Sequence, residues 1–243
     1  MGCSATEARG CCDDLAREFA KVMSGIFVTG TDTDCGKTTV SVALLNALRE
    51  QGKSVAPFKP VAAGAEQING QWQNDDALRL MQAADCSLPY DAVNPYCFEQ
   101  PISPHLSREG QAIDMQRLLA QSSVLQAEHD VVLVEGAGGW LVPLDEQMDV
   151  ADLAQQLQLP VLLVVGLRLG CLNHARLTEK AILSSDVPYL GWIGSVIDPD
   201  MLALDQNIAT LEEKLEGSCL GVLPNGASEI RFRQGVDIAM WCS

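Results

Sequence analysis

The stretch GTDTDCGKTT, residues 30 to 39, carries a lysine and a threonine spaced as in loops that hold phosphate and metal. Such a loop has four residues between its first glycine and its Gly-Lys-Thr end. Five residues separate Gly30 from Gly36 here, so Thr31 stands where the first glycine is expected. Because the Gly-Lys-Thr end makes most of the contacts, we expect a working nucleotide site. Lys37 would reach the β- and γ-phosphates, and the Thr38 hydroxyl would reach Mg²⁺. The alternative is a tight strand-to-helix turn without a ligand.

Two aspartates inside this loop, Asp32 and Asp34, are unexpected beside phosphate, because like charges repel. We expect them to face cations, either the metal or an amine of a second substrate. Mg²⁺ on phosphates takes one or two further carboxylates. Glu135 ends the apolar run VVLVE, and Asp76 lies in QNDDALRL at the start of a helix. The alternatives are a surface charge for Glu135 and a helix N-cap for Asp75.

Lys59 in FKPVAAG is a second candidate cation. It follows an apolar run, and Pro60 keeps it extended. A lysine at the carboxyl end of a parallel strand would point into the same crevice as the loop and hold a phosphate or a carboxylate. A solvated surface lysine is the alternative.

The elements that must position these residues alternate between short apolar runs and helical patterns. Six runs are nearly continuous in apolar residues, as expected for strands covered on both faces: GIFVTG, KSVAPF, DVVLVEGAGG, LPVLLVVG, YLGWIGSVID and CLGVLP. Helical spacing follows the loop from Lys37 to Gly52 and recurs over residues 151–157 and 173–184. This alternation predicts an α/β fold with a doubly wound, mostly parallel sheet in a single domain. Residues 64 to 110 are the least regular part and are expected on the substrate side.

Composition limits the partners. The chain has 243 residues, 47% of them hydrophobic, and a net charge of −16. Such a surface repels nucleic acid and anionic membranes, so we expect neither as a partner. Nine scattered cysteines without a CxxC pair indicate reduced thiols in the cytoplasm. Residues 1–24 are interpreted as an accessory extension, or as the product of an upstream start codon with the real start at Met23, before a catalytic domain over 25–243. In it Asp13 could cap a helix with Leu15, Phe19 and Val22 on one face, and Met1, Gly2 and Thr6 fit a weak lipidation pattern.

Seven segments together resemble dethiobiotin synthetase, a P-loop NTPase-type enzyme of biotin synthesis. They occur in the family's order between about Gly25 and Pro224, and the loop with five intervening residues is itself typical of the family. The segments are FVTGTDTDCGKT, FKPVAAG, NDDA, VNPYCFEQPISPH, VLVEGAGGW, LPVLLVVGLRLGCLNH and GWIGSV.

The resemblance implies a cytoplasmic homodimer that uses ATP and Mg²⁺ to close a ring. One nitrogen of 7,8-diaminononanoate takes up CO₂ as a carbamate, ATP phosphorylates the carbamate, and the second amine displaces phosphate to form the cyclic urea. By matching positions, Lys59 and Lys37 would be catalytic, Thr33, Lys59 and Ala63 would contact the substrate, and Thr38, Asp76 and Glu135 would hold the metal. The implied nucleotide contacts are Asp34, Cys35, Gly36, Lys37, Thr38, Thr39, Asp76, Glu135, Gly136, Ala137, Gly138, Ser195, Val196, Pro224, Asn225 and Gly226.

The chain departs from the family pattern at three places. Ala63 stands where a serine is common, Ser195-Val196 where an Asn-Asp pair reads adenine, and Asp34 where glutamate is usual. A serine offers fewer hydrogen-bonding groups than an amide, so we expect looser base selectivity. Three rival interpretations stay open. A switch ATPase would have a lysine at Thr31, and an amidating ligase of cobalamin synthesis would need a further glutaminase domain. A paralogue that only binds nucleotide is the third.

Overall fold

The computed structural model describes residues 25–242, and every structural statement below refers to this range. The helix predicted around Asp13 and the lipidation pattern at Met1-Gly2 lie outside it. No helix among the described residues is long and apolar enough to cross a membrane.

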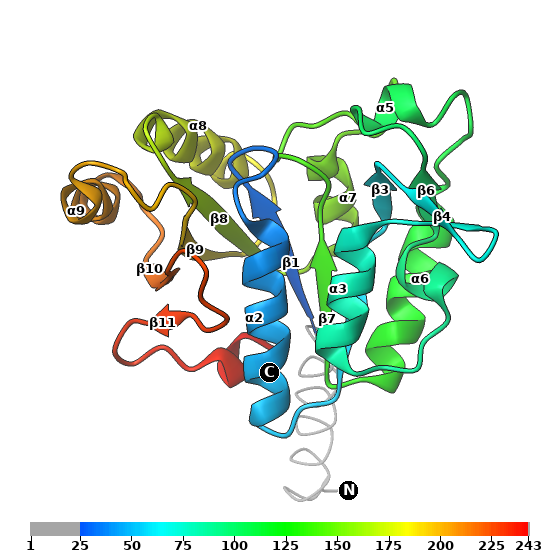
Figure 1. Cartoon of the computed structure of the whole chain (residues 1–243), viewed down its shortest axis with the longest axis horizontal. Helices are drawn as coiled ribbons and strands as arrows, with labels where there is room; N and C mark the ends of the chain where they lie inside the picture. The colour runs from blue at the N-terminus through cyan, green and yellow to red at the C-terminus, as the bar shows by residue number, and fades with distance from the viewer. Residues whose placement is uncertain (1–24, 243) are drawn as a thin grey trace, which may run out of the picture.

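A seven-stranded sheet forms the centre of the molecule, and it is parallel except at one edge (Figure 1). Its order is β11-β10-β9-β8-β1-β7-β2, and only β11 runs antiparallel to its neighbour. The strands are β1 (Gly25–Gly30), β2 (Val55–Phe58), β7 (Val131–Glu135), β8 (Val161–Leu167), β9 (Tyr189–Val196), β10 (Cys219–Leu223) and β11 (Arg231–Phe232). The six predicted strands are confirmed, whereas β11 was not expected.

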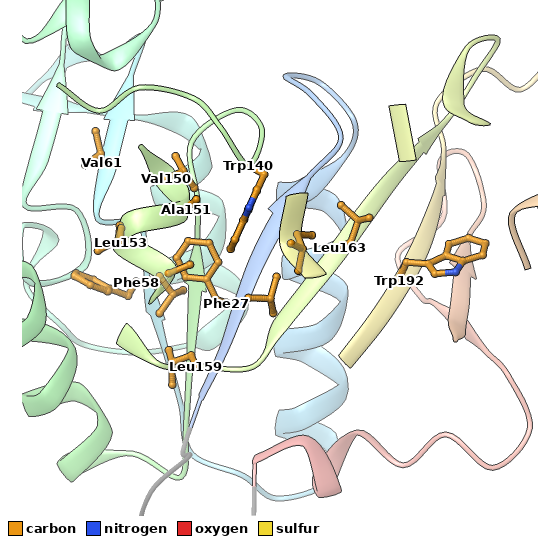
Figure 2. Packing of buried hydrophobic residues seen from close by; sticks show 14 of the residues in the cluster. Phe27, Phe58, Val61, Trp140, Val150, Ala151, Leu153, Leu159, Leu163 and Trp192 are labelled. Carbon is orange, nitrogen blue, oxygen red and sulfur yellow. The ribbon is translucent and has the colours of Figure 1, made fainter. Parts of the chain in front are cut away.

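Helices cover both faces of this sheet, so the predicted doubly wound fold is confirmed. On one face β1 packs Ile26 and Val28 against α2 and α3. On the other face Phe27 packs among side chains that include Leu153 of α7 and Leu163 of β8 (Figure 2). The helices are α2 (Lys37–Glu50), α3 (Asp75–Ala84), α6 (Met115–Glu128), α7 (Val150–Leu157), α8 (Cys171–Leu183) and α9 (Leu204–Lys214). A 3₁₀ helix, η1 (Ile238–Cys242), lies near the C-terminus.

The segment predicted to be irregular, residues 64–110, contains several short elements. A β-hairpin of β4 (Glu66–Ile68) and β5 (Gln71–Gln73) precedes α3. A two-stranded parallel sheet pairs β3 (Val61–Ala63) with β6 (Tyr96–Phe98). Two single-turn helices, α4 (Tyr90–Val93) and α5 (Pro104–Ser107), complete the segment. Figure 1 shows β3, β4, β6 and α5 grouped on the same side of the molecule as α3 and α6.

Candidate active site

The loop between β1 and α2 has the strand–loop–helix geometry that a phosphate cradle requires. Gly36 precedes the helix in the left-handed region with φ +90°, and a Cβ there would lie 2.2 Å from Ser195 Oγ. Glycine is therefore needed for both conformation and space. Asp34 is also left-handed, with φ +59°, so the longer loop includes a second left-handed turn residue. The first backbone amides of α2, which follow Gly36, have no partner within the helix, as an anion-binding helix N-terminus requires.

The two loop aspartates have different partners. The Asp32 carboxylate pairs with Arg168, and His174 Nδ1 lies 3.6 Å from it. Its cation is thus a side chain of this chain rather than the metal or the substrate amine that we expected. The Asp32 main-chain oxygen accepts a 2.8 Å hydrogen bond from Lys37 Nζ, which keeps the lysine folded over the loop. Asp34 is exposed and lines the cavities described below.

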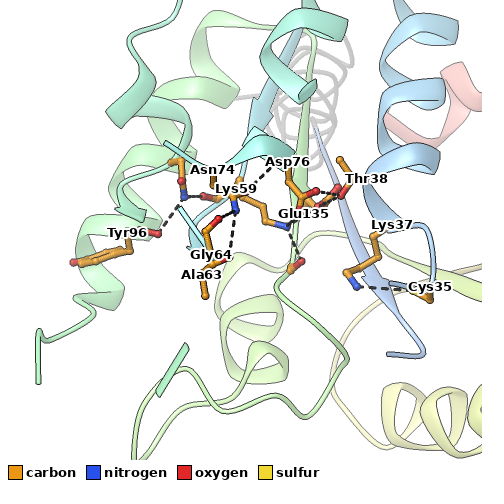
Figure 3. Close-up of polar contacts among 12 residues, drawn as sticks. Cys35, Lys37, Thr38, Lys59, Ala63, Gly64, Asn74, Asp76, Tyr96 and Glu135 are labelled. Carbon is orange, nitrogen blue, oxygen red and sulfur yellow. Dashed lines mark hydrogen bonds and ion pairs between the residues drawn. The ribbon is translucent and has the colours of Figure 1, made fainter. Parts of the chain in front are cut away.

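Four side chains from four elements meet beside this loop: Thr38, Lys59, Asp76 and Glu135 (Figure 3). Thr38 Oγ1 lies 2.8 Å from Asp76 Oδ1 and 2.9 Å from Glu135 Oε1. Lys59 Nζ lies 2.6 Å from Glu135 Oε1 and 3.2 Å from Asp76 Oδ2. Lys59 and Glu135 are both buried, which contradicts the surface alternatives for these two residues.

Each residue of this cluster is positioned by the fold. β2 and β7 are parallel neighbours, so the residues at their carboxyl ends, Lys59 and Glu135, come together at one edge of the sheet. Asp76 lies in the first turn of α3, whose N-cap is Asn74. The Asn74 side chain accepts a 3.1 Å hydrogen bond from the Asp76 amide. The proposed capping role of Asp75 is therefore wrong, because Asp75 lies inside the helix and Asn74 already satisfies the free amide.

The oxygen atoms of the cluster fit a magnesium ion. The Thr38 hydroxyl has one proton, so hydrogen bonding explains only one of its two short contacts with carboxylates. Octahedral Mg²⁺ holds oxygen ligands at about 2.0–2.1 Å, which places adjacent ligands about 2.9 Å apart. Glu135 Oε2 is also buried without a hydrogen-bond partner. Residues 25–242 contain no cluster of three or more His, Cys, Asp or Glu side chains suited to a metal. The ion would therefore complete its shell with phosphate and water.

The charges of the cluster stabilise one another. Burial alone would lower the pKa of Lys59, but the adjacent carboxylates of Glu135 and Asp76 outweigh burial and raise it. Burial would raise the pKa of Asp76, yet Lys59 and the Thr38 hydroxyl bring it below its usual value. Both groups therefore remain ionised at neutral pH. Lys59 is a fixed positive charge at the meeting point of the sheet, the loop and α3.

Two cavities adjoin at these residues. The first, of about 310 Å³, runs along the loop past Gly36, Lys37, Thr38 and Thr39. The second, of about 540 Å³, is bounded by Ala62, Ala63, Gly64, Asn74, Pro101, Ile102, Ser103, Pro104, Ala137 and Val142. Thr33, Asp34, Lys59, Asp76 and Gly138 line both. Lys59 therefore lines both the cavity along the loop and the larger cavity beside it.

The residues implied for nucleotide base contact lie at the ends of β9 and β10. Asn225 Nδ2 donates to the carbonyls of Val196 and Ile197, at 3.0 and 3.3 Å, which brings the two predicted stretches together. Ser195 is buried against Gly36. None of Ser195, Val196 or Pro224 to Gly226 lines the two cavities, whereas Ile197 lines the first.

A single substitution tests base selectivity at this position. We expect Ser195→Asn to increase the preference for ATP several-fold, because one added hydrogen bond is worth about 0.5–1.5 kcal/mol. The measurement is kcat/KM for ATP, GTP and CTP. Ser123→Asn, the same change on the exposed face of α6, is the control. Unchanged ratios in Ser195→Asn would assign base reading to Pro224, Asn225 and Gly226 alone.

Several cavity residues were not found from the sequence. Ser103 and Pro104 line the larger cavity, and Arg79 and Ile197 line the smaller one. The motif VNPYCFEQPISPH contains Ser103 and Pro104, so the family resemblance was the signal that could have indicated them. Arg79 lies one helical turn after Asp76 on α3, a spacing that places it on the same side of the helix.

Comparison with known proteins gives the following relatives. A family model described as an AAA domain matches residues 24–229. An ATP-dependent dethiobiotin synthetase BioD of Aromatoleum aromaticum is 48% identical over 203 residues, covering 83% of this chain and 90% of the relative. The protein of the same name from Cellvibrio japonicus is 47% identical, covering 82% of this chain and 88% of the relative.

Solved structures of lower identity share the fold. The septum site-determining protein MinD from Pyrococcus horikoshii, complexed with Mg-ADP, has a TM-score of 0.53 at 16% identity, covering 83% of this chain and 81% of that chain. The signal recognition particle receptor FtsY from Elizabethkingia anophelis has a TM-score of 0.55 at 13% identity, covering 95% and 70%. Both similarities support a P-loop NTPase fold.

Proposed function

The chain belongs to the ATP-dependent dethiobiotin synthetase family, and from this membership we propose how its own residues divide the work of the reaction. It is an ATP-dependent ligase of biotin biosynthesis that forms dethiobiotin. The observation that carries the proposal is the position of Lys59, which faces both cavities and pairs with Glu135 at 2.6 Å.

The smaller cavity would hold the triphosphate of ATP. Backbone amides after Gly36 and the Lys37 ammonium would contact its phosphates, with Asp34, Cys35 and Thr39 forming the rest of the cradle. Lys37 would exchange its hydrogen bond to the Asp32 carbonyl for one to phosphate. Glycine-rich residues after β7, Gly136, Ala137 and Gly138, would form the opposite wall. Ser195, Val196, Pro224, Asn225 and Gly226 would lie toward the base.

Thr38, Asp76 and Glu135 would hold the metal through their oxygen atoms. Bound there, Mg²⁺ would neutralise phosphate charge and orient the transferring group. Support comes from the paired short contacts of Thr38 and the unpartnered Glu135 Oε2. Hard oxygen donors are also the ligands that Mg²⁺ prefers.

The larger cavity would hold the diamine and its carbamate. Thr33, at the rim shared by both cavities, would contact the reacting end of the substrate, and Ala63 would line its path without a hydroxyl. Lys59 would stabilise the anionic carbamate and then the charge that develops during phosphoryl transfer. Attack of the second amine on the carbamoyl carbon releases phosphate and closes the cyclic urea.

We also propose that the enzyme is a homodimer in the cytoplasm, with residues 25–243 as its catalytic domain. Exposed leucines support such an interface: Leu169 and Leu202 are 95% and 88% exposed, and Leu177 on α8 is also exposed. Cys35, Cys86, Cys97, Cys171 and Cys219 are free thiols, in line with a reducing compartment.

Phosphate release tests this function against its rivals. We expect release from Mg·ATP only when 7,8-diaminononanoate and bicarbonate are both present, with one dethiobiotin formed per phosphate. Release that is independent of the diamine would indicate a switch ATPase. Nucleotide binding without any release would indicate a silent paralogue.

A further inference from the structure

A relay of hydrogen bonds through three side chains joins the Lys59 backbone to the Asp76 backbone. Asn94 Nδ2 donates to the Lys59 carbonyl at 2.6 Å, and Asn94 Oδ1 accepts from Tyr90 Oη at 2.8 Å. Tyr90 Oη accepts in turn from the Asn74 backbone amide at 2.7 Å. The Asn74 side chain accepts from the Asp76 amide. The relay thus runs Lys59, Asn94, Tyr90, Asn74, Asp76.

The members of this relay have almost no unused hydrogen-bonding capacity. Both protons of the Asn94 amide are used, since Nδ2 also donates to the Tyr96 carbonyl at 3.2 Å. Both protons of the Asn74 amide are used, on the carbonyls of Ala63 and Gly64. Burial raises the pKa of Tyr90, which keeps its phenol neutral and able to donate and accept at once. Asn74 and Asn94 are buried, so a lost partner would leave a buried polar group short of a hydrogen bond.

The relay adds polar contacts between two elements that also pack together, since α3 contacts β2. Lys59 follows β2, the edge strand of the main sheet, and its amide donates to the Val93 carbonyl at 2.8 Å. Asp76 begins a helix reached through the β4–β5 hairpin. The distance between the Lys59 ammonium and the Asp76 carboxylate depends on how these two backbones are held. An error of 1 Å in such a distance can cost about 10²-fold in rate.

We propose that Tyr90 and Asn94 are positioning residues for the synthetase reaction, which hold the Lys59 and Asp76 backbones in register so that cation and metal ligand act on one phosphoryl group. This inference rests on the proposed roles of Lys59 and Asp76. Tyr90 and Asn94 line neither cavity; they act through Lys59 and Asp76, which line both.

The test compares two tyrosines whose phenols each accept a hydrogen bond from a backbone amide, Tyr90 inside the relay and Tyr96 outside it. Tyr90→Phe removes the acceptor of the Asn74 amide and should lower kcat about 10–100-fold, as typical for a supporting partner behind a metal site, with KM for ATP within about two-fold. Tyr96→Phe removes a phenol that accepts from the Asp114 amide at 2.8 Å, at the start of α6 and outside the relay. The Tyr96→Phe variant should lose as much thermal stability as Tyr90→Phe but keep its kcat.

A double-mutant cycle with Lys59→Gln distinguishes a loss of Lys59 positioning from a general destabilisation of the site. If the relay acts by placing Lys59, Tyr90→Phe should cause little further loss of kcat in the Lys59→Gln background. Asn94→Asp, which keeps the size but removes both donors, should repeat the kcat loss if Tyr90→Phe folds poorly. Equal kcat losses in the Tyr90 and Tyr96 variants, or full additivity with Lys59→Gln, would overturn the relay. A Lys59→Gln variant with normal turnover would instead overturn the proposed function beneath it.

Discussion

Replacing Lys59 with glutamine is expected to lower diamine- and bicarbonate-dependent phosphate release by on the order of 10²-fold or more, while binding of a non-hydrolysable ATP analogue stays within a few-fold. Lys37 belongs to the phosphate cradle, so its loss should weaken binding and chemistry together. Lys59 comes from the end of another strand and faces the larger cavity as well. Its charge should therefore matter most when the carbamate is bound and phosphorylated.

Equilibrium binding measured beside steady-state turnover decides this prediction. Lys53→Gln is a matched control, because it makes the same change just before the opposite end of β2. If nucleotide binding and turnover fall in parallel in Lys59→Gln, Lys59 only binds phosphate, as Lys37 does. If neither falls, the cation between the two cavities has no part in the reaction.

Replacing Glu135 with glutamine is expected to abolish measurable turnover, a loss of at least about 10²-fold, with the fold retained. The amide keeps the shape of the side chain but removes the charge that faces Lys59 and Thr38. Affinity for Mn²⁺ in the presence of an ATP analogue, measured by electron paramagnetic resonance, should fall as well. Circular dichroism reports whether the variant is folded.

Glu179→Gln provides the control for burial. Glu179 is the other buried glutamate among the described residues, and it accepts from the amides of Glu216 and Gly217 at 2.9 Å. Its substitution should lower thermal stability and leave Mn²⁺ affinity and turnover unchanged. Near-normal activity of Glu135→Gln at saturating Mg²⁺ would remove Glu135 from the metal shell.

The strand pattern predicts much of this site because a parallel sheet aligns its carboxyl ends. Apolar runs identified β1, β2 and β7, and their ends deliver the loop, Lys59 and Glu135 to one edge. Neighbouring strand order, β1-β7-β2, could not be read from the sequence. This order places the ends of β2 and β7 side by side, so that Lys59 and Glu135 form an ion pair at 2.6 Å. Asp76 was a candidate from the sequence, at the start of an expected helix, but its position beside Thr38 depends on α3 packing against α2.

Other features were not predicted from the sequence, because their local patterns are weak or because they depend on tertiary contacts. Helix α6 is capped by Asp114 and buries Leu118, Ser122 and Leu125, a narrow stripe with one polar member. Helix α9 buries only Ile208 and Leu211. The pairing of Asp32 with Arg168 joins residues 136 positions apart, which no local pattern reveals. The cap at Asn74 was assigned instead to its neighbour Asp75, because both residue types favour that position.

The most direct test of the role of Lys59 is to measure whether the protein binds the carbamate. ¹³C NMR with labelled bicarbonate and 7,8-diaminononanoate, in the absence of ATP, reports the carbamate held by the protein. We expect a bound carbamate resonance in the unchanged protein and in Lys53→Gln, and its loss or strong weakening in Lys59→Gln. A bound resonance of equal intensity in Lys59→Gln would contradict the claim that Lys59 recognises the carbamate between the two cavities.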